Sequence, residues 1–91
     1  MLSKRKLDYK TYFILNCSTG ADVKIGKSSN PKKRLSVIQP GNHSKLVILA
    51  ILEEDIEKEL HIKFKEYHSF GEWYRFEGEL KNYISSLVQD D

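Results

Sequence analysis

The chain has 91 residues, 40% of them hydrophobic and 31% charged, which is the composition of a folded domain and excludes a disordered tail. This length suffices for one small domain with a modest core, and the net charge of +2 favours a polyanionic partner only weakly. The single cysteine excludes an internal disulfide and is typical of a reducing compartment.

The first third of the chain predicts a β-hairpin. Residues 10–16 are rich in Thr, Tyr, Phe and Ile, which favours a strand, and the apolar residues of the segment 22–27 alternate with polar ones. The small and polar residues between these segments predict a turn. If the hairpin is symmetric about Ser18, Tyr12 lies opposite Lys24.

A short helix is expected directly after the hairpin. Ser29 or Asn30 can cap it, and Pro31 suits its first turn. The Pro40-Gly41 dipeptide is expected to end it. The residues expected to face inward are Leu35 and Ile38.

The second half of the chain predicts a third strand and two further helices. Residues 45–52 contain the apolar run LVILAIL, which is typical of a buried strand and too short to span a membrane. Apolar residues at spacings of four, four and three over residues 53–68 indicate an amphipathic helix, and residues 78–88 predict the last helix. The expected inward positions are Ile56, Leu60, Phe64 and Tyr67 in the first of these helices, and Leu80, Ile84, Leu87 and Val88 in the second.

This order predicts an α+β domain over residues 10–88, following a basic N-terminal segment at 1–9. The domain is expected to contain a three-stranded antiparallel sheet flanked by helices, in the order β-β-α-β-α-α. Glu72 is interpreted as structural. Four nearby aromatic residues are expected in the core because a small domain needs their bulk: Phe70, Trp73, Tyr74 and Phe76.

Several side chains on these elements are of the types that phosphodiester hydrolysis requires. Such a reaction needs a group that orients or deprotonates water, a cation on the transition state, and usually a metal ion. Tyr12 and Lys24 lie on the predicted hairpin, and Arg34 lies on the following helix. Glu57 is a plausible Mg²⁺ anchor, because Mg²⁺ retains most of its waters and needs few protein ligands. His61 follows Glu57 by one helical turn and is expected either to support the site or to pack in the core.

Four short motifs in this chain resemble those of the GIY-YIG nuclease superfamily. The segment at 12–16, YFILN, is similar to the strand that carries the first motif's tyrosine. The segment at 24–28, KIGKS, is similar to the second motif, with Lys24 in place of its tyrosine. The segments at 57–64 and 71–74 resemble the ExxLHxxF and GEWF motifs of a small phage, viral and bacterial branch.

The resemblance implies a metal-dependent endonuclease, with DNA as the expected substrate. It implies Tyr12 near the attacking water, Arg34 on the scissile phosphate, and Glu57 on one Mg²⁺ or Mn²⁺ ion. Lys24 would act as a base or hold a phosphate, and Lys10 and Thr11 replace the glycine and isoleucine of the first motif. The expected nucleic-acid contacts are Lys27, Ser28, Lys32 and Lys33.

Two other functions stay open on the sequence. The loss of the second tyrosine is compatible with a catalytically inactive nucleic-acid-binding module of the same fold. The weak net charge also allows a small accessory protein, such as a phage-encoded modulator, that binds another protein. A nuclease of this size is expected to gain specificity from a homodimer or a partner protein, with no membrane partner. It is expected to act in the cytoplasm, or in the host cytoplasm if it is of phage or viral origin.

Overall fold

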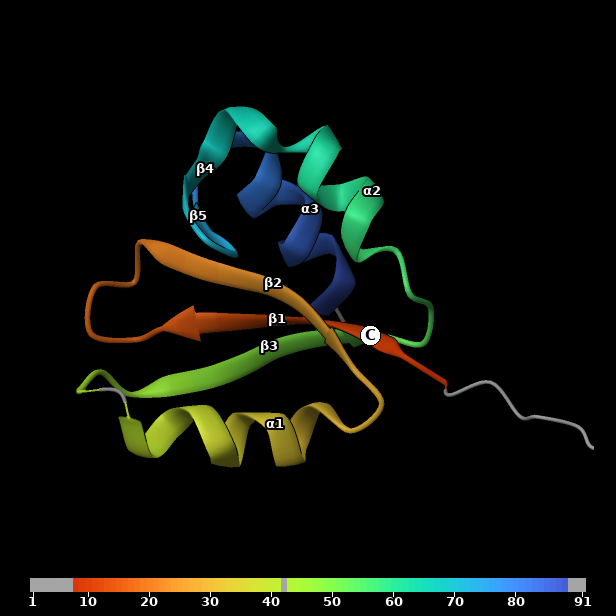
Figure 1. Cartoon of the computed structure of the whole chain (residues 1–91). Helices are drawn as coiled ribbons and strands as arrows, with labels where there is room; N and C mark the ends of the chain where they lie inside the picture. The colour runs from red at the N-terminus through yellow and green to blue at the C-terminus, as the bar shows by residue number, and fades with distance from the viewer. Residues whose placement is uncertain (1–7, 42, 89–91) are drawn as a thin grey trace, which may run out of the picture.

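The computed structural model describes residues 8–41 and 43–88, so most of the basic segment expected at 1–9 lies outside the described residues. The chain forms an α+β domain in which one five-stranded antiparallel sheet is flanked by three α-helices (Figure 1). The strands follow the order β3-β1-β2-β5-β4 across the sheet. Their bounds are Lys10–Asn16 for β1, Asp22–Ser28 for β2, Leu46–Leu52 for β3, His68–Phe70 for β4 and Trp73–Arg75 for β5.

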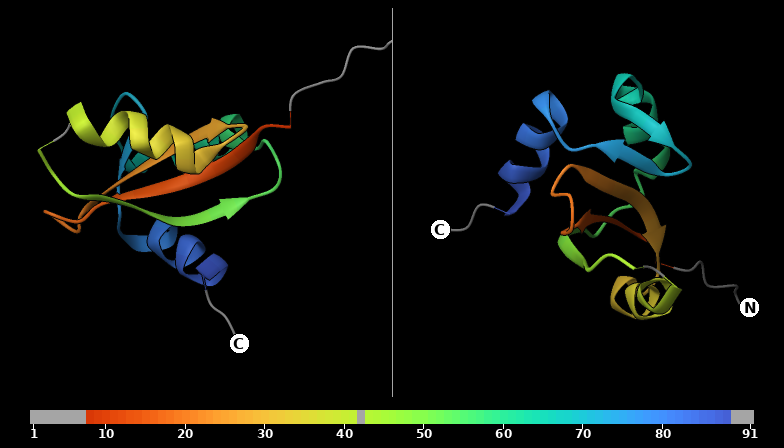
Figure 2. Two further views of the ribbon diagram at one scale, coloured as in Figure 1. Left: turned by 90° about the horizontal axis from the view of Figure 1, so that it is seen from below. Right: turned by 90° about the vertical axis from the view of Figure 1, so that its left-hand side faces the viewer.

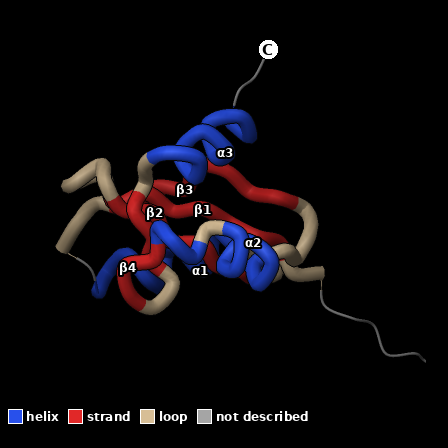
Figure 3. The backbone as a smooth tube through the Cα atoms, turned by 90° about the horizontal axis from the view of Figure 1, so that it is seen from above, coloured by secondary structure: helices blue, strands red, loops and turns tan. Residues whose placement is uncertain are grey.

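The helices lie on both faces of the sheet. Helix α1 (Pro31–Ile38) lies on one face, and α2 (Glu57–Lys63) and α3 (Gly78–Val88) lie on the other (Figures 1 and 2). Seen from above, α2 and α3 lie over the strands (Figure 3). Two 3-10 turns, Gln39–Gly41 and Lys65–Tyr67, follow α1 and α2. Within the described residues, the helices are too short and too polar to cross a membrane.

Each face of the sheet has its own hydrophobic cluster, because successive side chains of a strand point to opposite faces. On the face of α1, the buried residues Tyr12 and Ile14 pack with Leu46. The predicted inward residues of this helix, Leu35 and Ile38, pack against them. On the opposite face, α2 and α3 cover a larger cluster of buried residues: Phe13, Val23, Ile25, Leu60, Phe64, Tyr74, Leu80 and Ile84.

The predicted number of strands is wrong, although the three predicted strands are present. Strands β4 and β5 add a second hairpin to the sheet, and β5 pairs with β2. Each of these strands has three residues, which is too short for an alternating pattern to be recognised in the sequence. Gly71, with φ of +56°, forms their turn in a backbone conformation that other residues rarely adopt.

The predicted hairpin is present, but its register differs by two residues from the expected one. Tyr12 lies opposite Gly26, and Lys24 lies opposite Ile14. The loop is tightened by two hydrogen bonds around Asn16, whose carbonyl accepts from the Gly20 amide and whose side chain accepts from the Ser18 amide. Because the shift is an even number, Tyr12 and Lys24 still lie on the same face of the sheet.

Helix α1 is capped as expected, since the Asn30 side chain accepts a hydrogen bond from the Lys33 amide. The helix predicted over 53–68 is wrong in length. The buried Thr11 hydroxyl donates to the Glu54 carbonyl and accepts from the Ile56 amide, at 2.7 and 2.9 Å, which holds the segment before α2 in a loop. These bonds join residues far apart in the chain, so no local pattern predicts them.

Three expectations about burial are also wrong. Phe70 is 69% exposed and Val88 is 46% exposed. Strand β3 is an edge strand in which only Leu46 is fully buried. These segments are apolar in sequence, but they lie at the edges of the sheet and at the end of α3, where their side chains stay partly exposed to solvent. Tyr74 is buried as expected, and Trp73 and Phe76 are half-buried.

Candidate functional site

The Tyr12 side chain is placed by the absence of a side chain on Gly26. A Cβ atom at Gly26 would lie 2.4 Å from the Tyr12 hydroxyl, so the aromatic ring crosses the strand where only glycine leaves room. Tyr12 is 1% exposed, and its hydroxyl lies beside the Arg34 side chain of α1. Burial raises the pKa of Tyr12 above its usual value, and the Arg34 contact only partly offsets this, so the hydroxyl keeps its proton at neutral pH.

Lys24 of β2 lies on the same face of the sheet as Tyr12 and forms an ion pair with Glu72. The Lys24 Nζ atom lies 3.0 Å from Glu72 Oε1 and 5.9 Å from the centre of the Trp73 ring. The turn that carries Glu72 is fixed against β2, because the Ile25 amide donates a hydrogen bond of 3.0 Å to the Glu72 carbonyl. Glu72, a residue that its motif favoured as structural, therefore lies beside Lys24 in the candidate site. Only the pairing of β5 with β2 brings it to Lys24.

Glu57, in the first turn of α2, lies beside Glu72. The Glu57 side chain is 14% exposed, and its carboxyl lies close enough to that of Glu72 to interact with it. Burial and the neighbouring Glu72 raise the pKa of Glu57. Burial alone would also raise the pKa of Glu72, but the hydrogen bond and charge of Lys24 lower it. The two carboxyls thus differ in proton affinity because only Glu72 contacts Lys24 directly.

His61 connects α2 to β2. Its Nε2 atom donates to the Ile25 carbonyl at 3.0 Å and lies 3.7 Å from Glu57 Oε2. Its ring contacts that of Tyr74, with the centres 5.2 Å apart. His61 therefore packs against Tyr74 and lies beside Glu57, and its supporting role stays a prediction.

The expected nucleic-acid contacts divide into two groups. Ser28 and Lys33 line a hollow at the start of α1 together with Arg34, and Lys32 is exposed on the same helix. Lys27 lies away from this hollow and lines a second one at the start of α2. Its Nζ atom lies 3.6 Å from Asp55 Oδ2 and close to the ring of Tyr9.

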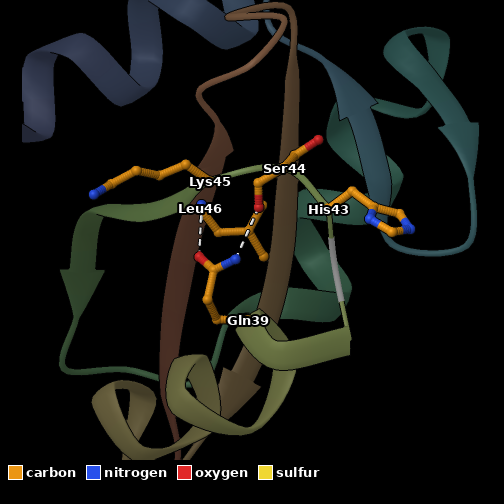
Figure 4. A pocket seen from close by; sticks show the side chains of 5 residues that line it. All are labelled: Gln39, His43, Ser44, Lys45 and Leu46. Atoms are coloured by element: carbon orange, nitrogen blue, oxygen red, sulfur yellow. Dashed lines mark hydrogen bonds between the residues drawn. The ribbon is translucent and has the colours of Figure 1, made fainter.

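A further pocket lies at the other end of α1 (Figure 4). There the Gln39 side chain donates to the Ser44 carbonyl and accepts from the Leu46 amide, both at 2.8 Å. These bonds tie the end of the helix to the start of β3. The residues of this pocket therefore connect α1 to β3, and they lie at the opposite end of α1 from the turn that carries Arg34.

Residues 10–88 match the model of one protein family, described as the T5orf172 domain. The chain belongs to the T5orf172 domain family. This is a phage-associated domain found in nuclease-like proteins. The match covers every residue of the site described above. No curated protein and no solved structure matches the chain.

The carboxyl pair of this T5orf172 domain has donors of the type that Mg²⁺ and Mn²⁺ prefer. Within residues 8–41 and 43–88, no group of three or more His, Cys, Asp or Glu side chains is arranged to hold a metal ion. Glu57 and Glu72 could supply oxygen ligands from two elements, and the Glu57 side chain is 14% exposed. A divalent cation that keeps most of its waters is compatible with such a small ligand set.

Substitution of Glu57 by glutamine is expected to stabilise the metal-free protein at pH 7. Burial and Glu72 raise the pKa of Glu57 in the folded protein above its value of about 4.5 in the unfolded chain. The carboxyl therefore stabilises the fold at a pH below the unfolded-state pKa, and this stabilisation is lost as the pH rises through the folded-state pKa. The glutamine side chain does not ionise, so the variant does not lose this stability as the pH rises. Thermal unfolding in EDTA should therefore show a higher midpoint for the variant at pH 7, with the difference disappearing at about pH 4. Glu59→Gln, at an exposed position of α2, is the control, and equal midpoints for Glu57→Gln and wild type at pH 7 would contradict the prediction.

Proposed function

We propose that this T5orf172 domain is a metal-dependent endonuclease of the GIY-YIG type, with DNA as its substrate. The observation that supports this best is the neighbourhood of the Tyr12 hydroxyl. The hydroxyl lies beside Arg34 of α1, and on the same face of the sheet Lys24 Nζ lies 3.0 Å from Glu72 of the β4–β5 turn, which is next to Glu57 of α2. A hydroxyl, a guanidinium and a carboxyl pair thus converge from separate elements, as hydrolysis of a phosphodiester requires.

In the proposed reaction, Arg34 binds the scissile phosphate and stabilises the negative charge that develops on it. The protonated Tyr12 hydroxyl and the Lys24–Glu72 pair orient the attacking water. Glu57 and Glu72 would hold one Mg²⁺ or Mn²⁺ ion, which when bound supplies Lewis-acid stabilisation of the leaving 3′ oxygen. His61 keeps Glu57 in position through its bond to the Ile25 carbonyl.

The substrate backbone would cross the start of α1. Ser28 and Lys33 lie beside Arg34, and Lys32 is exposed on the same helix, so these groups are placed to bind phosphates next to the scissile one. Lys27 would reach a phosphate only by leaving Asp55. Contacts to phosphates carry no sequence information, so we propose that a second copy of the chain or a partner protein supplies specificity. We also propose that the enzyme acts in the cytoplasm, or in the host cytoplasm if it is phage-encoded.

The test is incubation of the purified protein with supercoiled plasmid and with single-stranded DNA, in Mg²⁺, Mn²⁺ or EDTA. Cleavage is expected with either metal and not in EDTA. Glu57→Ala should abolish it, because the variant loses the buried carboxyl, whereas Glu59→Ala, exposed on the same helix, should retain it. Cleavage that persists in Glu57→Ala or in EDTA would contradict the proposal.

One observation favours the alternative of an inactive nucleic-acid-binding module. Lys24 stands where the second tyrosine is expected, and its amine is paired with Glu72. This alternative predicts salt-sensitive binding of DNA without cleavage in any metal. Absence of both cleavage and binding would instead favour the accessory protein that binds another protein.

A further inference from the structure

A row of three side chains crosses the sheet beside the proposed site. Phe70 of β4 pairs with Trp73 of β5, and Trp73 pairs with Lys24 of β2. Side chains of directly paired residues lie on the same face of a sheet, and the irregularity of the β4–β5 ladder falls between His68 and Phe70, before the Phe70–Trp73 pair. This is the face that carries Tyr12 and α1, because Trp73 packs against the cluster that contains Tyr12. We call Phe70, Trp73 and Lys24 the cross-strand row.

The outer end of this row is open to solvent. Helix α1 lies along β1 and β3, while the β4–β5 hairpin is at the other end of the sheet (Figures 1 and 2). Exposure increases along the row accordingly: the Lys24 side chain is 15% exposed, Trp73 is half-buried and Phe70 is 69% exposed. Phe70 is the most exposed of the large hydrophobic residues in the described part of the chain.

The backbone next to Phe70 is anchored by hydrogen bonds. The β4–β5 turn is closed by a hydrogen bond of 2.9 Å between His68 Nε2 and the Gly71 carbonyl, and it is attached to β2 through the Ile25 amide. An exposed aromatic ring on an anchored backbone is suited to binding, since the strand loses little conformational freedom when a partner covers the ring.

We infer that Phe70 is a stacking platform for an unpaired nucleobase next to the phosphate held at Arg34. The occupant is a nucleic acid because the row lies on the face of the sheet that carries α1, whose exposed cations Lys32, Lys33 and Arg34 attract a phosphate backbone. The Lys24 amine is itself paired with Glu72. The base must be unpaired because the face of a base is accessible to an aromatic ring only when that base leaves its stack. Single-stranded or splayed nucleic acid is therefore the substrate class. This inference rests on the proposed function but concerns binding, so it can be tested without cleavage.

The experiment measures binding in EDTA, so that no metal-dependent cleavage occurs, by anisotropy of a labelled oligothymidylate of about 12 nucleotides. The same strand in a duplex and the same strand with abasic positions are the comparison ligands. Phe70→Ala should weaken binding of the single strand by about 10-fold or more, and Phe70→Tyr should restore it. Binding of the duplex and of the abasic strand should change by less than about 2-fold. Ile62→Ala, 67% exposed on α2, is the matched control and should bind as wild type does.

The outcomes separate the inference from the proposed function. Selective loss of single-strand affinity in Phe70→Ala, together with weaker wild-type binding to the abasic strand, supports the platform. Equal binding of the single strand by wild type and Phe70→Ala overturns the platform and leaves the nuclease proposal intact. Equal weakening for all three ligands also overturns it, because loss of a stacking ring cannot affect an abasic strand. Absence of any binding by wild type at low salt overturns both.

Discussion

Cleavage by the Arg34→Ala variant is expected to be slower than wild type by at least about 100- to 1,000-fold at saturating DNA, because this guanidinium is proposed to stabilise the charge on the transition state. Arg34→Lys is expected to recover little of this activity. An ammonium keeps the charge but cannot donate two parallel hydrogen bonds to phosphate oxygens while also contacting the Tyr12 hydroxyl. Single-turnover cleavage of plasmid in Mg²⁺ measures the effect on the chemical step.

The neighbouring Lys33 supplies the matched control. It lines the same hollow as Arg34, so Lys33→Ala should weaken binding and lower its salt dependence by about one phosphate contact, with little change in the rate at saturation. Arg34 is exposed on α1, so its substitution should not unfold the domain, which circular dichroism would verify. A rate for Arg34→Ala within about 10-fold of wild type would contradict the proposed role of the guanidinium.

The Gly26→Ala substitution is expected to lower both stability and activity. The new methyl group would lie 2.4 Å from the Tyr12 hydroxyl and 2.6 Å from the ring carbon that carries it, so the ring must move away from Arg34. Overpacking of this kind costs about 1–3 kcal/mol, which urea unfolding would measure. Displacement of a group by about 1 Å can reduce cleavage by about 100-fold.

A double-mutant cycle with Tyr12 tests whether this contact is the cause. Tyr12→Leu removes the ring, so adding Gly26→Ala in that background should cost clearly less than it does in wild type. Gly41→Ala is the control, because a Cβ at Gly41 meets nothing within 4 Å and the residue has no positive φ. An equal cost of Gly26→Ala in both backgrounds would show that the strand itself, and not Tyr12, requires the glycine.

The correct sequence predictions concern features that neighbouring residues determine. The Asn30 cap with Pro31 defines the start of α1. The apolar spacing of α3 identifies Leu80 and Ile84 as core residues, because a helical period is visible over consecutive turns. The order of the motifs led to the nuclease hypothesis, and the family match over 10–88 agrees with it at the level of nuclease-like proteins.

The α+β class, the first three strands, two of the three helices and a set of candidate residues follow from the sequence, since each depends on local pattern or short spacing. Which of these residues meet depends on the folded chain. The contact of Tyr12 with Arg34 depends on a hairpin register and on a glycine without a side chain. The addition of Glu72 and the exposure of Phe70 depend on two strands of three residues each, which exist because β5 pairs with β2. Strands this short are stabilised mainly by the sheet they join, so local sequence indicates at most a short extended segment there and cannot show that β5 pairs with β2.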